Sequence, residues 1–300
     1  MGAVLASVLA AVLLAGCSSA GTAAAPGTVT AVGAENQYSN VISQIGGRYV
    51  RVSAVMSDPN TDPHTFESSP QVAQLVSSAE LVVQNGAGYD DFMTKIEQAI
   101  PSSARKVLVV QSLLGLTSVP PNPHFWYAPT TMPKVAAAVA ADLAQLDPAH
   151  AAYFRANLRR FDRSLGPWLD EIAAIKRRYA GARVASTEPV ADYLIRAAGL
   201  DDVTPFPFQA DVMNGVDPAP QDVSFEQELL SKREVRVFVY NKQVTDSLTE
   251  SLLGSAERHS VPVVGVYETM PRGYDYQSWM LAEAKALMDA LSSGKSSPSL

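Results

Sequence analysis

The sequence feature that most constrains the fold is a regular alternation of short strand-like segments with helix-like segments, which occurs in two blocks. The strand-like segments are Thr28–Gly33, Tyr49–Met56, Leu81–Gln84 and Lys106–Val110 in the first block, and Arg183–Ser186, Val235–Tyr240 and Val261–Val266 in the second. Strands that alternate with helices form mostly parallel sheets covered by helices on both faces. We therefore expect an α/β protein with two lobes, each built on a mostly parallel sheet.

The middle of the chain has no strand-like segment and predicts a helical connection. Met132–Leu146 is Ala-rich with helical spacing, and a second helical pattern follows, is interrupted at Gly166-Pro167 and resumes to Tyr179. A helix that continued through this interruption would span on the order of 45 Å at 1.5 Å per residue, long enough to join two lobes. A break there would give two ordinary helices, and the sequence leaves both alternatives open.

An uncharged apolar stretch, residues 1–16, stands directly before Cys17, the only cysteine of the chain. It is shorter than the ~18–20 residues of a membrane-spanning helix. Its end, Leu14-Ala15-Gly16-Cys17, resembles a bacterial lipoprotein signal, in which cleavage leaves the cysteine as a lipid-modified N-terminus. An ordinary secretory signal is the alternative, and no Lys or Arg precedes the stretch. We predict lipidation at Cys17 and an extracytoplasmic protein anchored to the outer face of the cell membrane.

These patterns predict the following division of the chain. It comprises a lipoprotein signal peptide at 1–16, a flexible tether at 17–27, an N-terminal α/β lobe at 28–131, a helical connection at 132–181, a C-terminal α/β lobe at 182–292 and a polar tail at 293–300.

Composition and the motifs that are missing exclude several classes of protein. Apolar residues make up 47% of the chain, which is enough for two buried cores and argues against disorder. There are 23 Lys and Arg against 30 Asp and Glu, with no basic run, so the electrostatic footprint of a nucleic-acid binder is missing. The sequence also contains no P-loop, GxGxxG, HExxH, GxSxG or CxxC motif.

Two histidines and two glutamates follow strand-like segments in matching positions. His64 and His124 each come directly after a proline in a loop of the first lobe, and Glu188 and Glu268 each follow a strand of the second lobe. In open α/β sheets the ligand crevice lies beyond the carboxyl ends of the strands. Two neutral imidazoles and two carboxylates balance a divalent cation and suit Mn, Fe or Zn. Taken singly, each of them could equally be a solvated loop histidine or a charge at a helix N-terminus.

Two motifs around these histidines carry a family resemblance. Residues 62–70, DPHTFESSP, are close to D-P-H-x-[YF]-E-P-[ST]-P with Ser68 in place of a proline, and residues 122–126, NPHFW, match N-P-H-x-W. The chain resembles the metal-binding solute-binding proteins of bacterial ABC importers for zinc, manganese and iron. The resemblance extends from Val29 to Leu291 and implies two α/β lobes joined by a long helix.

The resemblance also implies a ligand set. His64 and His124 are the expected first and second ligands. Glu188 occupies the position of the third, where family members have His or Glu. Glu268 occupies the position of the fourth, which is usually Asp, and the longer side chain leaves its denticity open.

The resemblance implies that the chain is a binding protein and not an enzyme. The chain would capture one divalent transition metal ion, Mn²⁺ or Zn²⁺ with Fe²⁺ as a further option, and deliver it to a membrane permease powered by a separate ATPase. We expect a monomer with no nucleic-acid partner. No histidine-rich loop lies between His64 and His124, and the carboxylate of Glu188 is a harder ligand than a third imidazole would be. Both features favour Mn²⁺ or Fe²⁺. The Irving–Williams order, in contrast, predicts tighter binding of Zn²⁺ than of Mn²⁺.

The sequence also leaves open whether Asn241 or Tyr267 lines the cleft.

Three other functions remain as alternatives. A secreted metallohydrolase could use the same ligands, but a catalytic zinc site normally has three protein ligands and an open position. An adhesion or scaffold lipoprotein could carry a structural metal site. A solute-binding protein for a non-metal ligand should offer Arg clamps, and the ligand segments contain no Arg cluster.

Overall fold

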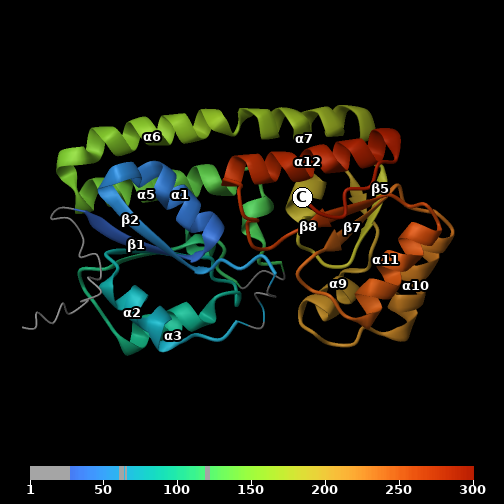
Figure 1. Ribbon diagram of the computed structural model, residues 1–300, viewed down its shortest axis with the longest axis horizontal. Helices are drawn as coiled ribbons and strands as arrows, with labels where there is room; N and C mark the ends of the chain where they lie inside the picture. The colour runs from blue at the N-terminus through green and yellow to red at the C-terminus, as the bar shows by residue number, and fades with distance from the viewer. Residues whose placement is uncertain (1–27, 61–63, 65, 119–121) are drawn as a thin grey trace, which may run out of the picture.

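Two α/β lobes, each with a four-stranded parallel sheet, make up the protein in its computed structural model (Figure 1). The structure describes residues 28–60, 64, 66–118 and 122–300. The expected signal peptide, Cys17 and the tether lie outside the described residues. The prediction of two lobes with parallel sheets is confirmed.

The N-terminal lobe has the strand order β2-β1-β3-β4. Its strands are β1 (Val29–Glu35), β2 (Val50–Met56), β3 (Leu81–Gln84) and β4 (Lys106–Val109). Its helices are α1 (Asn36–Gly46), α2 (Pro70–Ser78), α3 (Asp91–Ala99), α4 (Val110–Leu113) and α5 (Thr131–Leu146). Ser69 caps α2, since its hydroxyl accepts a hydrogen bond from the Val72 backbone N–H at 3.4 Å.

Alternate residues of the N-terminal strands pack into two different cores. Ala31 and Val83 face the core beneath α1 and α5, whereas Val32 and Val82 face the core that α2 and α3 cover. Figure 1 shows these helix pairs on opposite sides of the sheet. A strand buried on both faces must be apolar at nearly every position, and Leu81–Gln84 is completely buried.

The C-terminal lobe has the strand order β6-β5-β7-β8. Its strands are β5 (Arg183–Ser186), β6 (Asp201–Asp202), β7 (Val237–Asn241) and β8 (Val263–Val266). Its helices are α8 (Asp192–Ala197), α9 (Phe206–Met213), α10 (Pro220–Ser231), α11 (Ser247–Arg258) and α12 (Tyr276–Ser293). Phe238 packs with α9, α10 and α11 on one face, and Val237 and Val239 pack on the other face.

Two helices lie end to end across both lobes. They are α6 (Ala151–Ser164) and α7 (Gly166–Tyr179), separated only by Leu165, which has helical dihedral angles. Figure 1 shows them in one line, with α12 running alongside below. The proline at position 167 lies in the first turn of α7, where it interrupts no hydrogen bond that a helix would need.

One continuous hydrophobic core extends beneath these helices from one lobe to the other. It contains Tyr38 of the first lobe, Val239 of the second, Trp168 of α7, and Tyr276 and Trp279 of α12. Burial of aromatic side chains on this scale is strongly stabilising. The two lobes therefore share a packed boundary. None of the described helices combines the length and the apolar character that crossing a bilayer requires.

The polar end of the chain lies along the outer strand β8. Ser297 pairs with Val264 in a parallel bridge, and the backbone N–H of Gly265 donates to the Ser297 carbonyl at 2.9 Å. Gly265 is required here, because a Cβ at this position would collide with the Pro298 carbonyl. The tail thus covers part of an edge that would otherwise expose unpaired backbone groups.

Candidate metal centre

The four candidate ligands all lie beyond the carboxyl ends of parallel strands. His64 lies between β2 and α2, and His124 immediately precedes the short 3-10 helix Phe125–Tyr127. Glu188 follows β5, and Glu268 follows β8. Each lobe thus contributes two of the four side chains.

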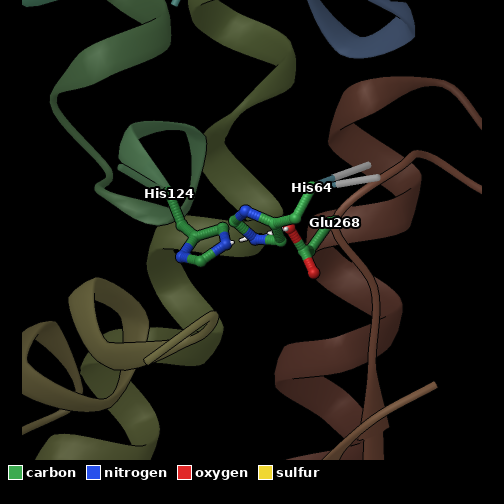
Figure 2. Close-up of side chains that lie close together, drawn as sticks. All are labelled: His64, His124 and Glu268. Carbon is green, nitrogen blue, oxygen red and sulfur yellow. Dashed lines mark hydrogen bonds and ion pairs between the residues drawn. The ribbon is translucent and has the colours of Figure 1, made fainter. Parts of the chain in front are cut away.

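Three of these side chains converge on one point (Figure 2). The Nε2 atoms of His64 and His124 each lie 3.1 Å from Oε2 of Glu268. Among the described residues, this is the one group of His, Cys, Asp or Glu side chains that places a ligand atom from each of three residues within 4.8 Å of the others. Two imidazole nitrogens and a carboxylate oxygen at this separation are suitable donors for a borderline divalent cation.

Glu188 is not part of this three-residue group but is linked to it through Asn241. The Asn241 side-chain nitrogen donates to Oε1 of Glu188 at 3.0 Å and to Oε1 of Glu268 at 2.8 Å. Both glutamates are at most 2% exposed. The two carboxylates therefore lie on either side of one amide group.

Asn122 fixes the orientation of the His124 ring. Its Oδ1 accepts a hydrogen bond from the His124 backbone N–H at 2.9 Å and lies 2.9 Å from His124 Nδ1. An amide oxygen can only accept hydrogen bonds, so the ring nitrogen beside it must be the donor. The ring proton is therefore assigned to Nδ1. The Nε2 lone pair of a neutral His124 then faces Glu268, which is the tautomer that metal ligation needs.

Asn122 also connects the two lobes next to the site. Its Nδ2 donates to the carbonyl of Pro189, the residue after Glu188, at 2.6 Å. Its own carbonyl accepts from the Tyr193 hydroxyl at 3.0 Å. The His124 loop and the Glu188 loop are thereby held against each other.

Glu268 is the electrostatic centre of the cluster. Its complete burial alone would raise the pKa of the carboxyl group, but His64 and His124 outweigh burial and hold that pKa well below its usual value. The Tyr89 hydroxyl donates to Oε2 of Glu268 at 2.9 Å. Burial lowers the pKa of His124, more than Glu268 raises it. Glu268 is therefore held in its ionised form, and burial favours the neutral form of His124.

The backbone of Glu268 is held as firmly as its side chain. Oε1 of Gln243 accepts hydrogen bonds from the backbone N–H groups of Glu268 and Thr269, at 2.6 and 2.7 Å. The Gln37 side chain donates to the Glu268 carbonyl at 3.2 Å, from the other lobe. These hydrogen bonds hold the Glu268 loop in place from both lobes, and such preorganisation is typical of a binding site.

Aromatic rings enclose the histidine side of the cluster. The Tyr89 ring lies edge-on to both His64 and His124, at centroid distances of 5.2 and 5.8 Å, and the Trp126 ring lies 5.3 Å from His124. An apolar wall excludes water and strengthens electrostatic interactions inside the site. The His64 side chain is 20% exposed, whereas those of His124 and Glu268 are fully buried.

Sequence reasoning left several of these contacts unassigned. Tyr89 was not a candidate, because its position in the Gly-rich turn Gly86–Tyr89 reveals nothing about the direction of its hydroxyl group. Of the two open candidates for the cleft, Asn241 contacts both glutamates. The Tyr267 hydroxyl instead accepts a hydrogen bond from the Leu300 backbone N–H at 3.3 Å.

Comparison with known proteins gives a consistent result. The family model described as "Zinc-uptake complex component A periplasmic" (ZnuA) matches residues 32–290. The manganese-binding lipoprotein MntA of Bacillus subtilis is 24% identical over 249 residues, 77% of either chain. The iron-binding protein YfeA of Yersinia pestis is 22% identical over 223 residues, which cover 69% of this chain and 67% of YfeA.

Solved structures share the fold. A crystal structure of ZnuA superposes with a TM-score of 0.73 at 22% identity, over 88% of this chain and all of that one. A Mn-bound periplasmic metal-binding protein of Candidatus Liberibacter asiaticus gives a TM-score of 0.71 at 15% identity, over 88% of this chain and all of that one. Because the family model covers most of the sequence, this chain belongs to the ZnuA family of metal-binding periplasmic solute-binding proteins of ABC importers, which are not enzymes.

Proposed function

We propose that this chain captures one divalent transition metal ion between its two lobes and delivers it to the permease of an ABC importer. His64, His124 and Glu268 would bind the ion directly, and Glu188 would be the fourth ligand. The observation that carries this proposal is the convergence of two imidazole nitrogens on one oxygen of a buried carboxylate. Buried charged groups in proteins are paired or coordinate metals, and this cluster offers the donors for a metal.

Mn²⁺ and Zn²⁺ are the proposed cargoes, with Fe²⁺ as a further option. Two nitrogens with two carboxylates form a donor set that suits all three ions. Two relatives are named as manganese-binding and iron-binding proteins, and the description of the family names zinc uptake. The choice of metal therefore depends on how many oxygen atoms the two glutamates offer.

The ion would enter and leave past His64. This ligand is 20% exposed, whereas Glu188 is 2% exposed and the other two are fully buried. Wide separation of the lobes would break the core that they share, including the packing of Tyr127 against Trp279 at 5.9 Å between ring centroids. Displacement of His64 alone would remove one ligand and open the site without separating the lobes.

Lipid attachment at Cys17 would keep the protein close to its permease at the outer face of the membrane. The 10 residues after Cys17, Ser18–Gly27, are rich in Ser, Ala and Gly and would serve as a flexible tether. We further propose that the chain acts as a monomer, since the four proposed ligands all come from one chain. Mass spectrometry of the exported protein and light scattering of the soluble part test these two statements.

The decisive experiment measures metal content by mass spectrometry on protein lacking residues 1–17, followed by Mn²⁺ and Zn²⁺ titration of the metal-free form. We expect about one ion per chain, and loss of binding in His64→Ala and His124→Ala. His259→Ala is the matched control, because His259 lies at the end of α11 and its Nδ1 contacts the Ser255 carbonyl. A folded, metal-free chain that takes up neither ion would refute the proposal.

A further inference from the structure

Asn241 lies between the two loops that carry the glutamates. It is the last residue of β7, and β7 lies between β5, which leads to Glu188, and β8, which leads to Glu268. Parallel strands end at the same edge of a sheet, so the last residue of the middle strand lies between the loops of its neighbours. Asn241 is 1% exposed.

The orientation of the Asn241 amide is fixed by its other contacts. Its Oδ1 accepts from the Gln243 backbone N–H at 3.0 Å, so its nitrogen must face the carboxylates. An amide nitrogen carries two hydrogens, and here one is directed to Glu188 and one to Glu268. The Asn241 backbone N–H donates to the Thr187 hydroxyl at 3.1 Å, which anchors the residue to the loop of Glu188.

The two oxygens of Glu268 consequently have different surroundings. Oε1 is held by Asn241 at 2.8 Å, whereas Oε2 faces His64 and His124 at 3.1 Å each. A carboxylate can bind an ion through one oxygen or through both. Turning Oε1 toward an ion beside the histidines would break the hydrogen bond from Asn241.

We propose that Asn241 is a positioning residue that restricts Glu268 to ligation through Oε2 alone and so favours Zn²⁺ over Mn²⁺. This inference rests on the proposed function. Zinc sites are most often four-coordinate and tetrahedral, whereas Mn²⁺ prefers more ligands and more oxygen atoms. An amide donor that withholds one oxygen from the ion keeps the coordination number low. Removal of that donor should release Oε1 and shift the balance toward Mn²⁺.

Two variants test this role. Asn241→Ala removes the donor entirely, and Asn241→Leu removes it while keeping the approximate size of the side chain. Asn157→Ala is the matched control, because Asn157 is also buried and donates to the Ile45 carbonyl in the N-terminal lobe. The measurements are the Mn²⁺ and Zn²⁺ dissociation constants and the coordination number from X-ray absorption.

We expect both Asn241 variants to gain an oxygen ligand in the metal-bound form. The ratio of the Mn²⁺ to the Zn²⁺ dissociation constant should fall about tenfold, the lower end of effects seen when partners of metal ligands are changed. Asn157→Ala should leave the ratio unchanged. If the wild-type chain binds metal normally and both Asn241 variants keep its ratio and coordination number, this inference alone is refuted. If the wild-type chain binds no metal, the proposed function fails and the inference fails with it.

Discussion

Replacement of Glu268 by glutamine should abolish tight metal binding while leaving the fold intact. The change keeps the size of the side chain but removes the charge on which His64 and His124 converge. Changes to the outer partners of metal ligands already cost 10–100-fold in affinity, so loss of a ligand charge should cost at least about 100-fold. A factor of 100 corresponds to about 2.7 kcal/mol.

This loss can be read from thermal unfolding. Metal at 100 times the wild-type dissociation constant stabilises the folded chain by about 2.7 kcal/mol. At 2–4 °C per kcal/mol for a large domain, the metal-dependent increase in melting temperature should fall by roughly 5–10 °C in Glu268→Gln. The metal-free variant should melt below the metal-free wild type, because removing one partner of a buried charged pair is destabilising, so the shift is measured from each protein's own metal-free melting temperature.

A matched control is available at Glu283 in α12. This carboxyl group is 1% exposed, and burial raises its pKa to about 8, so at neutral pH it is mostly protonated and closely resembles glutamine. Glu283→Gln should keep the full metal-dependent shift at pH 7. If Glu268→Gln also keeps the wild-type shift, Glu268 is not a ligand and the reasoning fails.

Three further predictions concern the partners of the site and the effect of pH. Asn122→Ala should weaken metal binding about 10–100-fold, because the proton on His124 Nδ1 loses its acceptor; isothermal titration showing wild-type affinity would contradict this. Metal affinity should fall as the pH drops below about 6.5, since a ligating imidazole must be neutral. Burial lowers the pKa of His124, so protonation of this ligand should weaken binding only at lower pH. Equal affinity at pH 7.5 and pH 5 would exclude histidine ligation. The raised pKa of Glu283 contributes stability that is fully present below its ordinary value of 4.5 and is lost as the pH rises through about 8. Metal-free wild type should therefore lose stability relative to Glu283→Gln between pH 5 and pH 9, and melting curves with a constant difference would refute it.

The sequence predicts most strands and helices because their faces alternate regularly. Residues 201–231 of the C-terminal lobe have no such pattern, and β6, α9 and α10 were not predicted. The strand β6 consists of two aspartates, which are among the residues least common in strands. In α10 the usual burial of apolar and exposure of charged residues is reversed, since Phe225 is 42% exposed and Glu226 is fully buried. Burial raises the pKa of Glu226 to about 8.

The candidate site shows a similar division. His64, His124, Glu188 and Glu268 were identified because each follows a strand, and the ends of parallel strands meet at one edge. The position of Glu188, which shares the Asn241 amide with Glu268, depends on side-chain directions that no local pattern encodes. The sequence likewise did not show whether Pro167 lies in the first turn of a helix or in a helix interior, which decides how α6 and α7 are joined.

The most direct test of the metal-binding account is anomalous diffraction from crystals of the Mn²⁺-loaded chain, repeated with Zn²⁺. The account predicts one strong peak bounded by Nε2 of His64, Nε2 of His124 and Oε2 of Glu268, with the Glu188 carboxylate as the fourth neighbour. A peak elsewhere on the molecule, or no peak in a folded and fully titrated protein, would contradict it.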